Sequence, residues 1–321
     1  DKSMLISELN KLVDSENKFV CVSRPRRFGK SMAGNMIAAY YSKGCDSREL
    51  FKDLKIAQDE SYETYLNKLN VIKLDLNGWY NNTPDRKLLF DDINESLREE
   101  FEQQFSNVRF KPTDNLARCI LRVYGQIGEK FVIIIDEYDA PLLADIGTMQ
   151  LEETRKMMQE FYQVLKSSVA DIKFCFLTGI TRFSQLSIFS EINHLNNISM
   201  WDEYSGICGI TKDELLNNLR AQVEEFANAK DISIDEAYAK LKEYYDGYRF
   251  SENSQEIFNP FSVMKALDQK KLKPFWFESA TPSALLKQLE RFTLADLADV
   301  EGAELMEQNF YAPYEASPSP I

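Results

Sequence analysis

The chain has 321 residues, of which 44% are hydrophobic, and its formal net charge is −13. This length and apolar content are enough for one large core with a smaller second unit, or for two domains. The acidic balance argues against direct nucleic-acid binding, which needs clustered Lys and Arg, and the apolar runs are too short to span a membrane.

Short apolar segments alternate with helical patterns over roughly the first 200 residues. The segments read FVCVS (19–23), VIKLDL (71–76), FVIIID (131–136) and KFCFLT (173–178). Near-continuous apolar runs of this length are typical of parallel strands that are buried on both faces. Between them, helical spacing is shown by Leu89, Ile93, Leu97, Phe101 and Phe105, and again by Met157, Phe161, Val164 and Leu165. The pattern predicts an α/β fold with crossover helices.

The first strand is followed by SRPRRFGKS (23–31), which ends as a phosphate-binding loop of the form GxxxxGK[ST] ends. Arg24 stands where that pattern has its first glycine, and because Pro25 follows, Arg24 should be extended. Backbone amides of such a loop and the start of the next helix bind phosphates. The predicted nucleotide-binding residues are Arg26, Arg27, Phe28, Gly29, Lys30 and Ser31. For the two arginines, a solvated pair that points outward is an equal alternative.

The strand at 131–136 ends in two adjacent carboxylates, Asp136 and Glu137. In P-loop ATPases an acid at such a strand end holds Mg²⁺, and a following glutamate activates the attacking water. We therefore expect Ser31 and Asp136 to hold Mg²⁺, with Lys30 and Glu137 as catalytic residues. By analogy with such ATPases, another strand should separate the loop strand from the acidic strand.

The fourth strand ends in LTGITRFS (177–184), which offers two further catalytic candidates, Thr178 and Arg182. Either side chain could contact the γ-phosphate. A Thr-Gly turn and a surface salt bridge are the respective alternatives. Guanine-binding proteins of this class carry N/TKxD, and TKDE at 211–214 has its Asp one place early, so ATP is favoured over GTP.

From about residue 206 helix signals replace the strands. Capping-box spacing occurs at Thr211/Glu214, Ser233/Glu236 and Thr293/Asp296, and prolines follow N-cap residues at Asn259-Pro260 and Thr281-Pro282. We expect a smaller, mainly helical lid over 206–321 after a P-loop ATPase domain over 1–205. In YYDGYRF (244–250), Arg249 either reaches the γ-phosphate or points outward from packed aromatics, with packing favoured. FWFE (275–278) is either core or a base-stacking platform, with core favoured because no basic residues lie between its aromatics.

The cysteines and the histidine suggest no disulfide framework and no metal site built on His and Cys. The five cysteines are odd in number and widely spaced, and the single His194 has no close Cys pair or second His. Reduced thiols and a cytoplasmic location are expected.

Several segments together resemble one family. They are DKSMLI, RPRRFGKS, VIKLD, IDEYDAP, LTGITRFS, YYDGYRF, IFNPFSV and FWFESA, in this order along the whole chain. The chain is similar to the AAA-ATPase-like family of bacterial and archaeal proteins, in which RPRRFGKS is the usual phosphate loop. The resemblance implies nucleotide contacts for Lys30 and Ser31, an acidic pair of Asp136 and Glu137, and a restriction-endonuclease-like domain downstream, absent from this chain.

The expected function is that of a regulatory module that binds Mg²⁺-ATP, hydrolyses it slowly and acts as a nucleotide switch. Two alternatives are a nucleotide-gated interaction module with little hydrolysis and the ATPase subunit of a DNA-processing nuclease. Glu137 argues against the first, and only the basic run Arg24, Arg26, Arg27 and Lys30 supports the second. Partners beyond ATP would be a second copy of the chain or a nuclease domain of the full-length protein.

Overall fold

A parallel sheet forms the centre of the computed structural model, which describes residues 1–180, 195–251 and 253–275. The sheet has five strands in the order β2-β3-β4-β1-β5, and all neighbours are parallel. The strands are β1 (Phe19–Ser23), β2 (Asn70–Asp75), β3 (Phe131–Asp136), β4 (Ile172–Gly179) and β5 (Leu195–Asn197). Strand β4 separates the loop strand β1 from the acidic strand β3, so the predicted strand order is confirmed.

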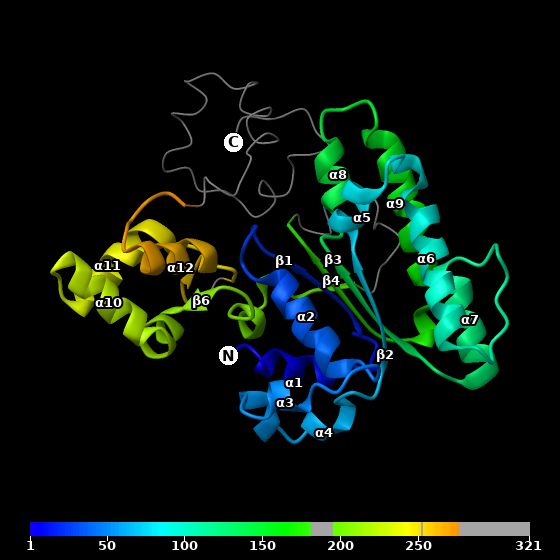
Figure 1. The fold of residues 1–321 in the computed structure, drawn as a ribbon, viewed down its shortest axis with the longest axis horizontal. Helices are drawn as coiled ribbons and strands as arrows, with labels where there is room; N and C mark the ends of the chain where they lie inside the picture. The colour runs from blue at the N-terminus through cyan, green and yellow to red at the C-terminus, as the bar shows by residue number, and fades with distance from the viewer. Residues whose placement is uncertain (181–194, 252, 276–321) are drawn as a thin grey trace.

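Helices cover both faces of this sheet (Figure 1). One face packs against α1 (Met4–Asn10), α2 (Lys30–Tyr41), α3 (Arg48–Phe51), η1 (Lys55–Gln58) and α4 (Tyr62–Tyr65). The other face packs against α5 (Leu76–Asn82), α6 (Leu89–Gln104), α7 (Leu116–Ile127), α8 (Ala140–Asp145) and α9 (Leu151–Ser167). Two short 3₁₀ turns, η2 (Arg86–Leu88) and η3 (Val169–Asp171), lie before α6 and β4. The predicted α/β class with flanking helices is confirmed.

Strand β3 shows how the sequence produces this layering. All six of its residues are buried. Because successive side chains point to opposite faces, Ile133 and Ile135 join the core under α6, α7 and α9, whereas Val132 and Ile134 join the core under α1 and α2. Each such aliphatic side chain contributes about 1.5–3 kcal/mol by burial. A strand with two buried faces has to be apolar throughout, as FVIII is.

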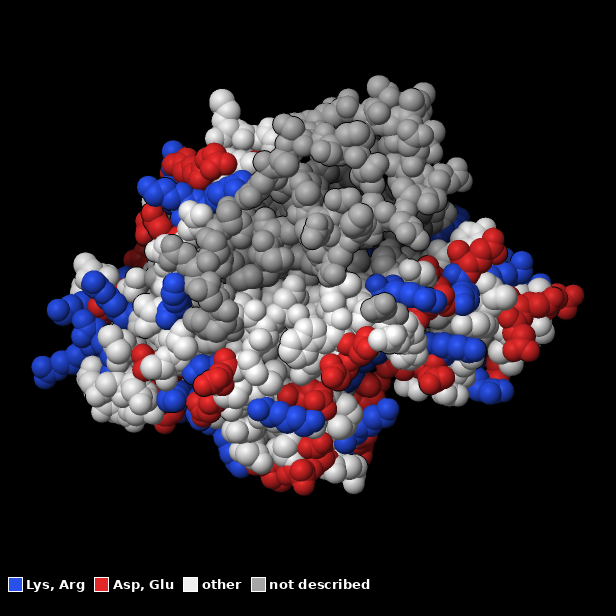
Figure 2. All heavy atoms as spheres, turned by 180° about the vertical axis from the view of Figure 1, so that it is seen from behind, with Lys and Arg blue, Asp and Glu red and all other residues white. Residues whose placement is uncertain are grey.

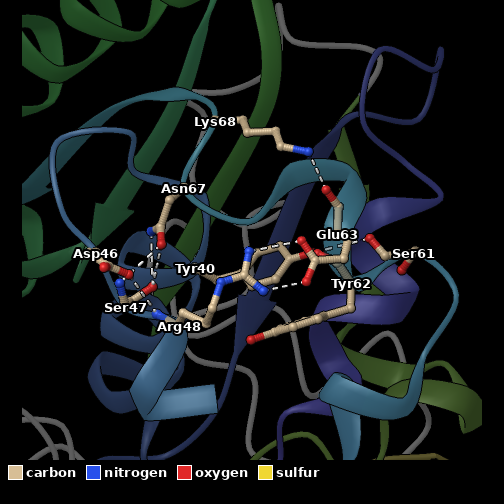
Figure 3. Close-up of polar contacts among 9 residues, drawn as sticks. All are labelled: Tyr40, Asp46, Ser47, Arg48, Ser61, Tyr62, Glu63, Asn67 and Lys68. Atoms are coloured by element: carbon tan, nitrogen blue, oxygen red, sulfur yellow. Dashed lines mark hydrogen bonds and ion pairs between the residues drawn. The ribbon is translucent and has the colours of Figure 1, made fainter. Parts of the chain in front are cut away.

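The carboxyl end of α2 is held by a polar cluster that Figure 3 shows. Asn67 lies in the left-handed region (φ 56°), and its amide donates to the Ala39 carbonyl at 3.1 Å. The Ser47 hydroxyl donates to the same carbonyl at 2.7 Å, and nearby Arg48 pairs with Glu63. Carbonyls in the last turn of a helix lack intrahelical partners, so these donors complete the helix. They anchor the far end of the helix that begins at the phosphate loop.

The segment after residue 205 is mainly helical, as expected, and also contains strands. Its helices are α10 (Arg220–Lys230), α11 (Ile234–Tyr245) and α12 (Pro260–Gln269), preceded by 3₁₀ turns η6 (Ile198–Met200) and η7 (Asp202–Tyr204) and the π-helical η8 (Glu214–Asn218). β6 (Ile210–Thr211) and β7 (Ile257–Phe258) form an antiparallel pair. The expectation that strands end near residue 206 was therefore wrong for these two short elements.

Capping predictions in this segment are confirmed where the structure describes them. Ser233 and Glu236 form a complete capping box, and the Asn259 side chain accepts a hydrogen bond from the Ser262 amide at the start of α12. Thr211 and Glu214 also exchange both capping bonds, at 3.0 and 3.2 Å. Thr293/Asp296, Pro282 and most of FWFE lie outside the described residues. The boundary of 1–205 and 206–321 stays a prediction.

Candidate functional site

The phosphate loop continues strand β1 without needing a glycine at its first position. The Arg24 amide donates to the Gly179 carbonyl of β4 at 3.1 Å, so Arg24 still follows the path of the sheet. Positive φ angles occur later in the loop, at Arg27 (66°) and Gly29 (90°). The steric freedom that a glycine provides is therefore used at Gly29, and an arginine is accommodated at position 24.

Successive backbone amides of this loop are available to a ligand. Among the described residues, the amides of Arg26, Arg27 and Gly29 to Met32 donate no hydrogen bond to another protein group. The first amides of a helix have no intrahelical acceptor, and α2 begins at Lys30, so they extend the same set. Adjacent unpaired amides at the start of a helix of 12 residues attract anions.

Lys30 is held against the loop by its own backbone. Its ammonium donates to the carbonyls of Arg24 at 2.9 Å and Pro25 at 3.1 Å, and the residue is 5% exposed. An ammonium has three N–H donors. Within the described part of the chain two of them are used, so the third can donate to a phosphate oxygen. Burial lowers the pKa of Lys30, and the carboxylates of Asp139 and Glu137 act in the opposite direction.

The acidic pair lies at the same edge of the sheet, at the carboxyl end of β3. Asp136 is buried, and its carboxylate accepts hydrogen bonds from the Thr178 hydroxyl and from the Glu137 amide at 3.1 Å. Glu137 has a positive φ of 51°, which is unusual for glutamate. Burial and the neighbouring Asp136 charge raise the pKa of Glu137. A carboxyl with a raised pKa is a stronger base than an exposed glutamate.

The other predicted site residues occupy different settings. Ser31 is exposed in the first turn of α2, and Arg26 is exposed as well. The exposed Arg27 stacks on the Phe261 ring of α12, with 3.9 Å from its guanidinium carbon to the ring centroid. Phe28 is buried. Arg182 and His194 lie outside the described residues, so their roles stay predictions.

Arg249 is exposed and pairs with Glu256 at 3.3 Å. Of its aromatic neighbours, Tyr245 and Phe250 are buried, whereas Tyr244 is 44% exposed. The packing interpretation of this segment is therefore confirmed, except at Tyr244.

Two carboxylates close to the site were not predicted. Asp75 is the register partner of Asp136 on the neighbouring strand β2. Asp139 is fully buried and accepts a hydrogen bond from the Ile180 amide at 2.9 Å. Among the charged groups near Lys30, Asp139 acts most to raise the pKa of Lys30. Both had a signal in the sequence, since Asp75 ends a predicted strand and Asp139 follows the acidic pair in IDEYDA.

An apolar pocket of about 450 Å³ opens beside Gly29. Its walls come from the start of α2, from residues 207–210 and from α12, and include Phe28, Met32, Met36, Cys208, Pro260 and Met264. A volume of this size is typical of a small-molecule site, and methionine side chains adapt to flat apolar ligands. No sequence signal marked this pocket, because its walls are far apart along the chain.

Gly209 connects the phosphate loop to this pocket and tolerates no side chain. Its amide donates to the Phe28 carbonyl at 3.0 Å, its φ is 90°, and a Cβ would lie 2.2 Å from Cγ2 of Ile257. An alanine would therefore meet both backbone strain and overlap with a packed side chain. The close approach of Phe28 to β7 depends on this glycine.

Gly209→Ala is expected to lower the free energy of unfolding by about 2–4 kcal/mol, because it adds strain and overpacking together. The measurement is urea denaturation followed by circular dichroism. Gly125→Ala is the matched control, since Gly125 lies within α7 and its Cβ would meet no atom within 4 Å. Equal denaturation midpoints for Gly209→Ala and the wild type would show that the contact is not as tight as described.

All five cysteines are free, and four of them are buried. Among the described residues no helix is long and apolar enough to cross a membrane. Figure 2 shows Lys and Arg side chains lying next to Asp and Glu side chains on both sides of the face it displays.

Comparison with known proteins agrees with this geometry. A family model described as "Predicted AAA-ATPase" matches residues 1–189, which is more than half of the chain. The chain belongs to the AAA-ATPase-like family. Membership in the AAA-ATPase-like family identifies the region as a nucleotide-binding module of ATPase type.

One curated relative is an uncharacterized protein in the vnfD 5' region of Azotobacter chroococcum mcd 1. It is 27% identical over 272 residues, which cover 84% of this AAA-ATPase-like chain and 48% of the relative. The chain thus spans about half the length of the curated relative it matches.

Proposed function

We propose that the chain binds Mg²⁺-ATP and hydrolyses it slowly as a nucleotide switch. The observation that carries this proposal is the run of unpaired amides from Gly29 to Met32, with those of Arg26 and Arg27, beside the buried ammonium of Lys30. Together they offer several donors and one positive charge to a polyphosphate. Arg26 and Arg27, both exposed in the same loop, can add charge around it.

A magnesium ion fits the donors available at this edge. Mg²⁺ prefers hard oxygen ligands, and the Ser31 hydroxyl and the Asp136 carboxylate are of this kind. The described residues contain no cluster of three or more His, Cys, Asp or Glu that would hold a metal on its own. At nucleotide sites Mg²⁺ shares its ligands with phosphates and water. Bound there, it would neutralise charge on the phosphates.

In the proposed reaction, Glu137 accepts a proton from the attacking water, and Lys30 stabilises negative charge on the transferred phosphoryl group. Thr178 keeps the Asp136 carboxylate in place by donating to it. The apolar pocket beside Gly29 would receive the base. Adenine is favoured, because Thr211 and Glu214 of the TKDE segment are used in capping bonds instead of facing a base.

The switch role is supported by contacts from the loop to the helical segment. Arg27 stacks on Phe261 of α12, and the pocket has walls from both α2 and α12. A nucleotide in this pocket would contact both regions, so its loss or hydrolysis would change how they are held together. Assembly with a second copy, or regulation of a downstream nuclease domain, are proposals for the full-length protein.

Phosphate release from Mg²⁺-ATP, measured with and without a chelator, tests this function. We expect slow turnover that chelation abolishes. Turnover unaffected by chelation would contradict the magnesium site. A chain that binds ATP without turnover would contradict the proposed hydrolysis and support nucleotide binding alone.

The pH dependence of this turnover is expected to show an acid limb set by Glu137. Burial and Asp136 raise the pKa of Glu137, so it becomes protonated at a higher pH than an exposed glutamate does. Protonated Glu137 cannot accept a proton from water, and turnover should fall as pH decreases within the range over which the protein stays folded. The measurement is the turnover rate at saturating ATP across this range, and a rate that is constant over it would argue against Glu137 as the base.

A further inference from the structure

Arg24 is the most deeply buried charged residue of the phosphate loop. It is 1% exposed, and its guanidinium donates to three backbone carbonyls, those of Ser23 at 2.9 Å, Ser199 at 2.7 Å and Tyr204 at 3.1 Å. Ser199 and Tyr204 belong to η6 and η7, which follow β5. A single side chain thus connects the loop to a segment about 180 residues away along the chain.

The same guanidinium packs against one ring of an aromatic pair in the helical segment. Its central carbon lies 3.9 Å from the centroid of the Phe250 ring, and the Phe28 ring meets Tyr248 and Phe250 edge to face at 4.8 and 5.4 Å. Tyr248 and Phe250 stack on each other and are here called the aromatic clasp. The clasp is joined to β7, because the Ile257 amide donates to the Tyr248 carbonyl at 2.9 Å.

The backbone of Arg24 also reaches the group that would bind phosphate. Its carbonyl accepts a hydrogen bond from the Lys30 ammonium at 2.9 Å, and the neighbouring Pro25 carbonyl accepts another. The position of the Lys30 charge therefore depends on where the first two loop residues lie. Those residues are placed by the Arg24 side chain and by the aromatic clasp.

We propose that Arg24 is a positioning residue, which couples nucleotide binding at the phosphate loop to the seating of the aromatic clasp in the helical segment. The proposal rests on the proposed nucleotide-binding function. It predicts that nucleotide affinity depends on Phe250, which belongs to the helical segment and contacts the side chains of Arg24 and Phe28. By linkage, bound nucleotide stabilises the clasp by as much as the clasp strengthens nucleotide binding.

The geometry requires arginine. A planar guanidinium can donate to several carbonyls at once and stack on a ring, whereas an ammonium is a compact charge that does neither in the same way. Arg24→Lys keeps the charge and removes this arrangement. Phe250→Leu keeps an apolar side chain and removes the ring face, whereas Phe250→Tyr keeps the ring. Tyr244→Leu is the matched control, because Tyr244 is an exposed aromatic of the same segment.

The first experiment is calorimetric titration of each folded variant with Mg²⁺-ATP. We expect Arg24→Lys and Phe250→Leu to weaken binding about tenfold each, and Phe250→Tyr and Tyr244→Leu to stay within about twofold of the wild type. The double variant Arg24→Lys/Phe250→Leu should lose clearly less affinity than the product of the two single losses, because both changes break the same contact. The proposal would be overturned if the loss of affinity in the double variant equalled the product of the two single losses. Normal affinity of Phe250→Leu would also overturn it.

The second experiment uses no nucleotide and measures hydrogen exchange of the Ser23 and Arg24 amides, which donate to the Ser199 hydroxyl and the Gly179 carbonyl. Exchange should be about tenfold faster in Phe250→Leu than in the wild type and normal in Phe250→Tyr, because the loop loses its support only in the former. If the wild type bound no ATP and this difference were seen, the nucleotide function would fail and the positioning role of Arg24 would stand. Equal loop exchange in all variants would overturn the positioning role itself.

Discussion

Replacing Lys30 by alanine is expected to weaken Mg²⁺-ATP binding by about 100-fold or more, which corresponds to about 3 kcal/mol. The change removes the one ammonium that the loop carbonyls of Arg24 and Pro25 hold in place, and leaves the amides of Arg26 to Met32. Affinity measured by calorimetry at fixed magnesium checks the result.

Lys43→Ala is the matched control for this variant. Lys43 follows the opposite end of the same helix, is exposed and pairs with Glu129 at 3.1 Å. An exposed pair of this kind contributes little to stability, so this variant should bind ATP as the wild type does. A folded Lys30→Ala protein with wild-type affinity would mean that the loop does not hold the phosphates.

The Glu137→Gln variant is expected to bind Mg²⁺-ATP with nearly normal affinity and to lose turnover by about 100-fold or more. Glutamine preserves the size of the side chain, and it cannot accept a proton from the attacking water. It also removes a carboxylate whose pKa burial and Asp136 raise, so the acid limb of the pH profile should vanish with it. Binding and phosphate release are measured on the same preparation.

Glu129→Gln serves as its control, because Glu129 precedes the same strand at the end remote from the loop. This control should hydrolyse ATP at the wild-type rate. If Glu137→Gln hydrolysed ATP equally fast, the activating base would have to be another group, and Asp75 and Asp139 would be the next carboxylates to test.

Much of the sheet could be predicted because both of its faces are buried. A strand such as β3 must be apolar between its ends, and the run FVIII is recognisable for that reason. Strand β5 was missed because it has three residues, Leu195–Asn197, two of them Asn, and none is fully buried. Strands β6 and β7 have two residues each, so neither shows a period. Short strands are defined by their partners more than by their own composition.

The candidate site divides in the same way. The loop residues and the pair Asp136 and Glu137 are contiguous in sequence and follow apolar strands, so they could be found without coordinates. The role of Arg24 could not, because its partners Ser199, Tyr204 and Phe250 are distant in the chain. The pocket beside Gly29 is likewise assembled from residues that only the fold brings together.

The central claim is that the variant loop binds ATP, and calorimetric titration of the wild-type chain with Mg²⁺-ATP and then Mg²⁺-GTP tests it most directly. We predict saturable binding of one ATP per chain and weaker binding of GTP, because the segment nearest to a guanine-binding motif is used in capping bonds. A well-folded chain that bound neither nucleotide would contradict the account.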